Sequence, residues 1–335
     1  MSQVSVILLN WNGEGYLAEC LDSVLAQDYE DMEIIVIDNA SSDGSVRLLK
    51  DRYIEEIQLI ENDMNIGFSR GMNMGFAVAS GKYVMPLNFD IIMEPGFISA
   101  MVNALEMDIR RGSVTGKLLK LNEQGRTNVI DSTGHIIFKN RYVMNRGEGE
   151  TDSGQLDQQD LVFGATGAAP LYRREMLDDI AWQGEYYDES FFIMLEDVDL
   201  DWRAQLKGWQ CAYTPQAVAY HYRTASKVSK SRLIQRHYYK NRYLVMWKND
   251  FFISWLKCLP QIFLMDLSLG LDIMFTRPIA LLMAWGDLVR LLPLMLRKRH
   301  AIQTNRKASR SDIEVWFKEY DWQNDLRRKL RLSYK

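Results

Sequence analysis

The first 90 residues alternate between short apolar runs and segments of helix length, and this alternation constrains the fold more than any other feature of the chain. The apolar runs read VSVILLN from Val4, EIIVID from Glu33, IQLIEN from Ile57 and KYVMPLN from Lys82. Such runs, separated by helical segments, predict parallel strands joined by right-handed crossovers. We therefore expect an α/β fold with a mostly parallel sheet flanked by helices.

Three polar or aromatic residues follow these runs. Trp11 comes after the first run, Asp38 ends the second, and Asp90 comes just after the fourth. Because ligands of open parallel sheets bind beyond the carboxyl ends of the strands, we expect these residues at one binding edge. The carboxylate of Asp38 could accept the imide N–H of uracil or thymine. The structural alternative is that Asp38 only forms a turn in DNASSDG.

Two adjacent acids, Glu196 and Asp197, stand at the start of an apparent amphipathic helix in FFIMLEDVDLDWR. An ionised carboxylate there could accept a proton from a sugar hydroxyl as that hydroxyl attacks, which is the role of a general base. Acids in a first helical turn also complement the helix dipole, so a purely structural role is the alternative.

Gly67, Gly71 and Gly75 repeat at a spacing of four in NIGFSRGMNMGF. Glycines on one helical face allow close approach to a strand or to a nucleotide. The spacing alone is explained equally well by a tight contact between helix and sheet.

Taken in order, these segments resemble a known family. The series LLNWN, VIDNASSDGS, NIGFSRGMNMGF, MPLNFD, GATGAAPLYRREML, FFIMLEDVDLDWR and AYH is similar to the inverting glycosyltransferases of family two, which have the GT-A fold. Within them it most resembles the rhamnosyltransferase-like branch that builds bacterial surface polysaccharides such as O-antigen. The resemblance covers about residues 4–249. We expect a Rossmann-like GT-A catalytic domain over residues 1–249 and an amphipathic helical region over residues 250–335.

The resemblance implies roles for individual residues. Trp11 would pack on the base that Asp38 holds, although a core tryptophan is the alternative. Arg70 and Asn73 would line the donor site, and Gly167 belongs to a small-residue segment beside the acceptor. Asp197 would be the general base, and Glu196 is placed with the substrate-binding residues.

Asn88-Phe89-Asp90 stands where the GT-A fold usually carries an Asp-x-Asp motif that holds a divalent cation on the diphosphate. Hard oxygen ligands suit Mg²⁺ or Mn²⁺. Here asparagine replaces the first aspartate, and Phe89 stands where relatives usually have proline. We expect Asp90 and His221 to bind the metal and Asn88 to contact substrate. A structural histidine is the alternative for His221.

The predicted reaction transfers a sugar, expected to be rhamnose, from a nucleoside-diphosphate sugar to a saccharide hydroxyl with inversion. The expected donor is dTDP-rhamnose, with a UDP-sugar second, and the acceptor is expected to be lipid-linked. The alternative function is a catalytically weak or inactive nucleotide-sugar-binding scaffold at a membrane surface, if Asn88 signals lost metal binding. A nicotinamide dehydrogenase is disfavoured because Gly13-Glu14-Gly15 lacks the third glycine of that fingerprint.

The C-terminal region is apolar and flanked by two basic segments, 223–242 and 290–310, with seven Lys or Arg and no acid in each. We expect two helices, broken near residues 276–278, that lie on an anionic leaflet. A hairpin packed on the catalytic domain or on a homodimer partner is the alternative. Segment 223–242 could also close over the diphosphate. Charged residues interrupt every window long enough to span a bilayer: Lys257, Asp266, Asp272, Arg277, Asp287 and Arg290.

The net charge and the cysteines indicate where in the cell the protein is expected. The formal net charge is −4, which argues against a nucleic-acid partner. The three cysteines are odd in number and widely spaced, and the first expected strand begins within four residues of the N-terminus, so we expect no signal peptide. We expect a peripheral protein on the cytoplasmic face of a bacterial inner membrane.

Overall fold

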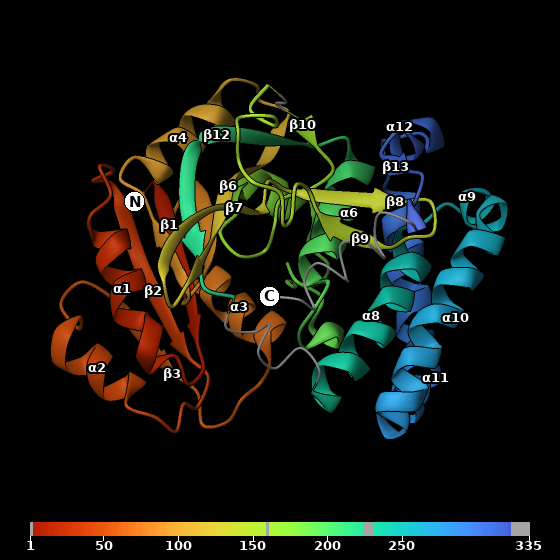
Figure 1. Cartoon of the computed structure of the whole chain (residues 1–335), viewed down its shortest axis with the longest axis horizontal. Coiled ribbons are helices and arrows are strands. Elements are labelled where there is room, and N and C mark those ends of the chain that lie inside the picture. Colours follow the sequence, from red (N-terminus) through yellow and green to blue (C-terminus); the bar gives the residue numbers. More distant parts are fainter. Residues whose placement is uncertain (1–2, 159–160, 224–230, 323–335) are drawn as a thin grey trace.

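A computed structural model of the chain describes residues 3–158, 161–223 and 231–322. Among these residues the centre is a ten-stranded sheet with the order β10-β12-β6-β11-β4-β1-β2-β3, in which β5 pairs with β12 and β7 with β6 (Figure 1). The strands of its N-terminal half are all parallel: β1 (Val4–Asn10), β2 (Met32–Asp38), β3 (Gln58–Glu61) and β4 (Tyr83–Asn88). They coincide with the four predicted runs, which confirms the α/β fold.

Helices cover both faces of this half. Successive residues of a strand point to opposite faces of the sheet. Accordingly Val6 and Leu8 of β1 belong to one hydrophobic cluster with α1, whereas Ile7 and Leu9 belong to another with α3. Burial on both faces explains why the strand sequences are continuously apolar. The helices are α1 (Glu14–Leu25), α2 (Ser45–Arg52), α3 (Phe68–Val78) and α4 (Phe97–Glu106).

The other half of the sheet is mixed. Its two long strands, β6 (Arg111–Asn122) and β12 (Gln210–His221), run parallel to each other. Each of the short strands pairs antiparallel with its neighbours: β5 (Ile91–Met93), β7 (Gly125–Ser132), β10 (Leu161–Val162) and β11 (Leu171–Arg173). The β5–β12 pair joins the end of the first half to the end of the second.

A smaller three-stranded sheet and three helical segments lie between the central sheet and the C-terminal helices. The sheet has the order β13-β8-β9, with β8 (His135–Phe138), β9 (Val143–Asn145) and β13 (Phe317–Lys318). The helical segments are α5 (Arg174–Ile180), the 3₁₀ turn η1 (Glu189–Phe191) and α6 (Glu196–Lys207).

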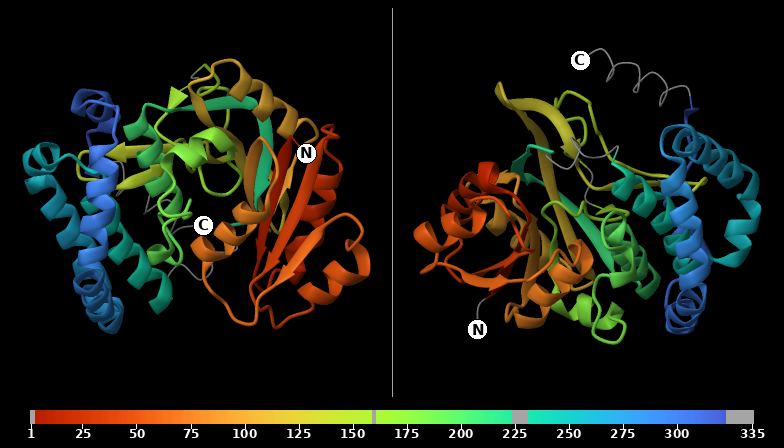
Figure 2. Two further views of the ribbon diagram at one scale, coloured as in Figure 1. Left: turned by 180° about the vertical axis from the view of Figure 1, so that it is seen from behind. Right: turned by 90° about the horizontal axis from the view of Figure 1, so that it is seen from below.

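The C-terminal helices pack on this layer at the side away from β3 (Figures 1 and 2). One hydrophobic cluster contains Trp202 of α6, Leu244 of α8 and Leu288 of α11. The predicted break lies where expected, since α10 ends at Thr276 and α11 begins at Pro278. The helices are α8 (Arg232–Asn249), α9 (Phe252–Lys257), α10 (Leu259–Thr276), α11 (Pro278–Thr304) and α12 (Arg310–Glu314). The division into residues 1–249 and 250–335 stays a prediction.

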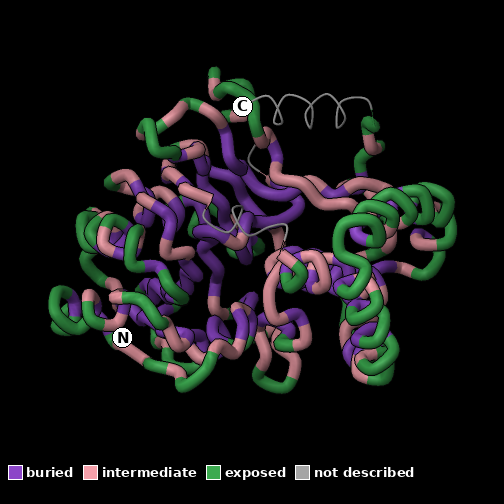
Figure 3. The backbone as a smooth tube through the Cα atoms, turned by 60° about the horizontal axis from the view of Figure 1, so that its bottom comes forward, coloured by how far each residue is buried: buried purple, intermediate pink, exposed green. Residues whose placement is uncertain are grey.

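Much of α10 and α11 is exposed (Figure 3), and many of the exposed residues there are large and apolar. Two of the charges that interrupt the apolar stretch turn inward, because Asp266 pairs with Arg242 at 2.8 Å and Asp287 with Arg236 at 2.7 Å. Both helices are long and apolar enough to cross a membrane. Some core helices of soluble proteins have the same length and composition, so this is weak evidence for a membrane span. The most exposed apolar residues on the two helices are Phe263, Phe275, Leu282, Trp285 and Val289.

Candidate active site

The residues predicted to recognise a base lie at the carboxyl edge of β1 and β2. Asn10 and Asp38 are register partners, and Asn10 Nδ2 donates to Asp38 Oδ1 over 2.7 Å. The backbone N–H of Ser41 donates to Asp38 Oδ2 at 2.9 Å. These donors fix the orientation of a buried carboxylate that still has lone pairs for a ligand. Trp11 is 49% exposed beside them, which excludes the core alternative.

Asn10 was not predicted as a site residue. Its position at the end of the first apolar run was the available signal, since residues at that edge meet the next strand's end.

The glycines of α3 serve the contact between helix and sheet. A Cβ on Gly71 would lie 2.6 Å from Leu9 Cδ1, and one on Gly75 would lie 2.3 Å from Ile7 Cγ2. Asn73 is buried, and its amide both donates to Tyr187 O at 2.8 Å and accepts from Tyr187 N at 3.0 Å. Its second amide hydrogen points to Glu189 Oε1 at 3.2 Å.

The amide hydrogens of Asn73 are therefore used within the protein, and its predicted donor-lining role has no support in this geometry. Arg70, also predicted to line the donor site, is exposed, with its Nε 3.9 Å from Glu189 Oε2. It stays a prediction.

Asp90 and His221 meet because β5 pairs with β12. Ile91, directly after Asp90, is the register partner of His221. The two side chains are buried, and His221 Nε2 lies 3.3 Å from Asp90 Oδ1. Asn88, two residues earlier at the end of β4, is half-buried and donates its backbone N–H to Ala168 O at 2.9 Å.

Asp131 completes this cluster and was not predicted. His221 Nδ1 lies 2.9 Å from Asp131 Oδ2, and Arg223 Nε lies 2.6 Å from Asp131 Oδ1. Burial would lower the pKa of His221, but hydrogen bonds to Asp131 and Asp90 raise it to about 9. Asp131 lies 90 residues before His221, so no local motif could have indicated the contact.

These residues fit a divalent cation. If a cation displaced the Nε2 proton of His221, the hydrogen bond from Nδ1 to Asp131 would hold the tautomer whose Nε2 lone pair can act as a ligand beside the oxygen of Asp90, as at many metal sites. The described part of the chain contains no group of three or more His, Cys, Asp and Glu side chains arranged around one ion. The protein would thus supply only part of the coordination, which is usual for Mg²⁺ or Mn²⁺ held with phosphate oxygens.

The loop before α6 has a strained backbone. Phe192, Met194 and Leu195 all have positive φ angles of 64°, 76° and 67°. Non-glycine residues adopt this conformation only where neighbouring groups hold it. Asn241 of α8 provides this support, because its amide donates to Phe191 O at 3.1 Å, Ile193 O at 2.8 Å and Met194 O at 2.7 Å. The start of α6 is thereby fixed in position.

Asp197 receives two backbone hydrogen bonds in the first turn of α6. Gly167 N–H donates to Oδ2 at 2.9 Å, and Val198 N–H donates to Oδ1 at 2.8 Å. A Cβ on Gly167 would lie 2.7 Å from Asp197 Oδ2, so a glycine is needed for this approach. The predicted acceptor-side segment and the predicted base are therefore in contact.

Glu196 has the opposite environment. It is buried, and its Oε2 has no hydrogen-bond partner among the described residues. Burial first, and then the charge of Asp197, raise the pKa of Glu196 to about 8. At neutral pH Glu196 is therefore mostly a neutral acid, whereas the carboxylate oxygens of Asp197 accept two backbone N–H groups.

His135 and Asp201 adjoin Asp197 on the side of β8. His135 Nδ1 lies 3.1 Å from Asp201 Oδ2, and His135 Nε2 lies 3.5 Å from Asp197 Oδ2. Burial would lower the pKa of His135, but the two carboxylates raise it above its ordinary value. Burial raises the pKa of Asp201 to about 6. Neither residue was predicted, because 66 residues separate them in the sequence.

Buried lysines tie the same loop to the C-terminal helices. Lys248 of α8 contacts both Asp188 and Asp199, and its Nζ lies 2.8 Å from Asp199 Oδ1. Lys298 of α11 lies 2.8 Å from Asp188 Oδ1 and 2.7 Å from Glu185 Oε2. Helix α11, which carries part of the apolar face, therefore also holds the segment that leads to Asp197, together with α8.

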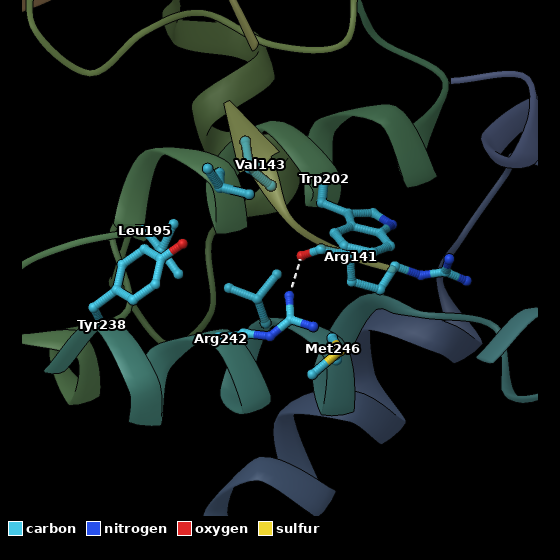
Figure 4. A pocket seen from close by; sticks show the side chains of 9 residues that line it. Arg141, Val143, Leu195, Trp202, Tyr238, Arg242 and Met246 are labelled. Carbon is cyan, nitrogen blue, oxygen red and sulfur yellow. Dashed lines mark hydrogen bonds between the residues drawn. The ribbon is translucent and has the colours of Figure 1, made fainter. Parts of the chain in front are cut away.

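A small cavity lies behind α6, bounded by Trp202, Tyr238, Arg242 and Met246 among others (Figure 4). Arg242 donates from its guanidinium to the carbonyl of Arg141 at its edge. Its volume is about 10 Å³, room for one water at most, so it is a packing gap and not a substrate site. The predicted closure of the basic segment over a diphosphate falls largely on residues 224–230, which lie outside the described residues.

Comparison with known proteins identifies the family of the chain. Residues 5–181 match the family described as Glycosyl transferase family 2. An uncharacterized glycosyltransferase of Haemophilus influenzae is 37% identical over 147 residues, which are 42% of this chain and 45% of that protein. The poly-β-1,6-N-acetyl-D-glucosamine synthase of Staphylococcus epidermidis is 25% identical over 221 residues, 65% of this chain and 49% of that protein. The chain thus spans about half the length of these curated relatives.

Solved structures share the fold. TarS 1-349 of S. aureus superposes with a TM-score of 0.55 at 16% identity, covering 91% of this chain and 89% of that one. GalNAc-T7, solved with UDP, GalNAc and Mn²⁺, gives a TM-score of 0.58 at 14% identity and covers 74% of this chain and 48% of that one. At these identities the likeness establishes the fold alone.

Proposed function

The chain belongs to glycosyl transferase family 2, and from that premise we propose that it transfers a hexosyl group from a nucleoside-diphosphate sugar to a saccharide hydroxyl with inversion. The observation that carries the proposal is the unequal pair at the start of α6. Glu196 is buried with a pKa raised to about 8, whereas Asp197 receives two backbone N–H groups. Adjacent carboxyl groups whose environments separate their protonation states are typical of acid–base sites.

Asp197 is the proposed general base. It takes the proton of the acceptor hydroxyl while that oxygen's electron pair forms the bond to the anomeric carbon. The bond from the anomeric carbon to the phosphate oxygen breaks on the opposite face, and its electron pair leaves with the diphosphate. One such displacement inverts the configuration without a glycosyl-enzyme intermediate.

The donor is proposed to be a pyrimidine nucleotide sugar. Asp38 would accept the imide N–H of the base, and half-exposed Trp11 would pack on its ring. The relative from S. epidermidis is named as an N-acetylglucosamine polymer synthase. We therefore place UDP-N-acetylglucosamine first among donors and dTDP-rhamnose second, which reverses the order expected from the sequence. The rhamnosyltransferase-like branch stays a prediction.

Asp90 and His221 are the residues that would hold a divalent cation, with Asn88 beside them. When bound, Mg²⁺ or Mn²⁺ would neutralise charge on the diphosphate leaving group. Two other proposed roles do not involve the cation. Asp38 orients the donor, and the backbone N–H of Gly167 holds the carboxylate of Asp197.

The acceptor is proposed to be lipid-linked and reached from a membrane surface. The exposed apolar residues of α10 and α11 are too many to be isolated surface residues. Exposed basic residues follow in the sequence, at Arg290, Arg297, Arg306 and Lys307. Pairing of Asp266 and Asp287 with α8 leaves the exposed side of α10 and α11 without their charges. We propose peripheral association with an anionic cytoplasmic leaflet, in the assembly of a bacterial surface polysaccharide.

Turnover of Asp197→Asn tests the assignment. We expect donor binding close to that of the wild type and turnover at least about 100-fold lower, because a general base is lost while the donor contacts remain. Donor binding is measured by thermal shift across UDP-, dTDP- and GDP-sugars, and turnover by release of the nucleoside diphosphate.

Asp178→Asn, an exposed carboxylate on α5, is the matched control and should behave as wild type. Near-normal turnover in folded Asp197→Asn would remove the proposed base. Donor binding without any turnover in the wild type, across a range of saccharide acceptors, would favour the scaffold alternative.

A further inference from the structure

His135 is the buried group best placed to act on the proposed base from behind. It extends from β8, while Asp197 and Asp201 both belong to α6 one helical turn apart. The imidazole lies between their carboxylates, 3.1 Å from Asp201 Oδ2 and 3.5 Å from Asp197 Oδ2. All three residues come from elements that pack in one layer, so the order Asp201, His135, Asp197 is built into the fold.

We infer that His135, oriented by Asp201, is a positioning residue that keeps the negative charge of the adjacent acid pair on Asp197 and not on Glu196. This inference rests on the proposed function, because it assigns the base role to Asp197. His135 acts through Asp197 and need not contact substrate.

Ionising both Glu196 and Asp197 costs free energy, because their negative charges repel each other. They are consecutive in sequence, and like charges at such a distance disfavour double ionisation. Which of the two carries the charge depends on their partners. Asp197 has two backbone N–H donors and the imidazole, whereas Glu196 Oε2 has no hydrogen-bond partner among the described residues.

His135 is the partner of Asp197 that can carry a full positive charge. A cation within about 4–6 Å favours the ionised form of a carboxylate by about 1–3 pH units. Asp201 supplies the opposite charge that favours the imidazolium. Its Oδ2 lies 3.1 Å from His135 Nδ1, and its Oδ1 has no hydrogen-bond partner within the described residues.

The other titratable groups near His135, Asp201 and the acid pair stay neutral near neutral pH. They come from β11, from the loop before η1 and from β12, and burial raises the pKa of each well above its ordinary value: Tyr172, Tyr187 and Cys211. Within the cluster, burial raises the pKa of Asp201 to about 6 and that of Glu196 to about 8, so both groups change protonation near neutral pH.

The test is the pH dependence of kcat/KM in His135→Gln, which keeps a hydrogen-bonding side chain and removes the charge. We expect the acid limb of the profile to move to higher pH by about one unit or more, while donor affinity changes less than twofold. In Asp201→Asn the acid limb of the kcat/KM profile should also move to higher pH, but by a smaller amount than in His135→Gln.

A double variant separates this role from general support of the fold. Glu196→Gln removes the carboxyl that would otherwise take the charge, so His135→Gln should move the acid limb less in that background than in the wild type. Asp199→Asn is the matched control, because Asp199 is equally buried on α6 but faces Lys248. It should lower the melting temperature without moving the limb.

An unmoved acid limb in folded His135→Gln would overturn the inference, as would equal shifts in the presence and absence of Glu196. If His135→Gln does not fold, an unmoved limb in Asp201→Asn overturns it instead. Asp197→Asn is measured in the same series. Normal turnover of that variant would defeat the proposed base, which is a different failure from an unmoved limb with Asp197→Asn inactive.

Discussion

Glu196 is a carboxylic acid that the folded protein keeps protonated. Its contribution to the free energy of unfolding therefore depends on pH. Its pKa is raised to about 8 in the folded state by burial and by Asp197, against 4.5 ordinarily. Between these two values the folded state binds a proton that the unfolded state has released. The contribution of Glu196 to stability is therefore fully present below about pH 4.5 and is lost as pH rises towards 8.

Glu196→Gln should remove this dependence. We expect the melting temperature of the variant minus that of the wild type to increase by at least about 2 °C between pH 5 and pH 8.5. The measurement is thermal unfolding in a pH series at constant ionic strength. Glu55→Gln, an exposed control, should show a constant difference. A constant difference for Glu196→Gln as well would mean that Glu196 is ionised in the folded protein.

Single residues at strand and helix ends could be predicted from the sequence, but their partners could not. Asp38, Asp90 and Asp197 each stand at an element boundary, where a local pattern makes them visible. Asn10 also ends a strand and was visible in the same way, whereas Asp131, His135 and Asp201 make contacts that only the packing of distant segments creates. The same limit explains Asn73, whose local pattern resembles a donor-site residue although its amide is used on Tyr187.

Among the elements, the β5–β12 pair determines the candidate metal site. Register places Asp90 next to His221 whatever the loops between them do. Asp90→Ala and His221→Ala should each weaken the binding of Mn²⁺ in the presence of UDP by at least about 10-fold, because each removes one ligand atom. Free Mn²⁺ measured by electron paramagnetic resonance gives the affinity without requiring turnover.

Matched controls exist for both variants. Asp63→Ala and His300→Ala change exposed residues of the same types and should bind Mn²⁺ like the wild type. Donor affinity that a chelator does not change would remove the cation from the proposal, and His221 would then be a structural histidine held by two carboxylates.

The parallel half of the sheet was predictable because its strands are buried on both faces and read as continuous apolar runs. The short strands β10 and β11 and the small sheet formed by β8, β9 and β13 were not predicted. They contain two to four residues each, so no periodicity marks them, and apart from the β8–β9 pair their partners lie far along the chain. The β8 strand nevertheless carries His135.

For the whole molecule, the decisive surface is the apolar side of α10 and α11. If it rests on an anionic leaflet, the protein should sediment with vesicles containing phosphatidylglycerol and detach partly at 1 M salt, because charges at the surface are screened. The triple variant Phe263→Glu, Leu282→Glu and Trp285→Glu should lose at least about nine-tenths of this binding, since it places charges in the interfacial contact.

A control with the same added charge uses Ile54→Glu, Met64→Glu and Met107→Glu, which are exposed apolar residues of the N-terminal half. It should bind vesicles like the wild type. Resistance of the wild type to both salt and alkali would indicate helices that cross the bilayer. No binding to vesicles, together with a dimer that the first triple variant breaks, would identify the face as a contact between two copies.

The lysines that join α8 and α11 to the loop before α6 bear on how this protein can be engineered. Deleting everything after residue 249 would remove Lys298 from Asp188 and Asp250 from Arg141, leaving charged groups in the interior without those partners. A crystallisable or industrial version is therefore better made by redesigning the outward side chains of α10 and α11 while retaining both helices. The same reasoning applies to chimaeras. The outward side chains of α10 and α11 can be changed to alter what the surface binds, but the helices themselves cannot be exchanged for those of another protein.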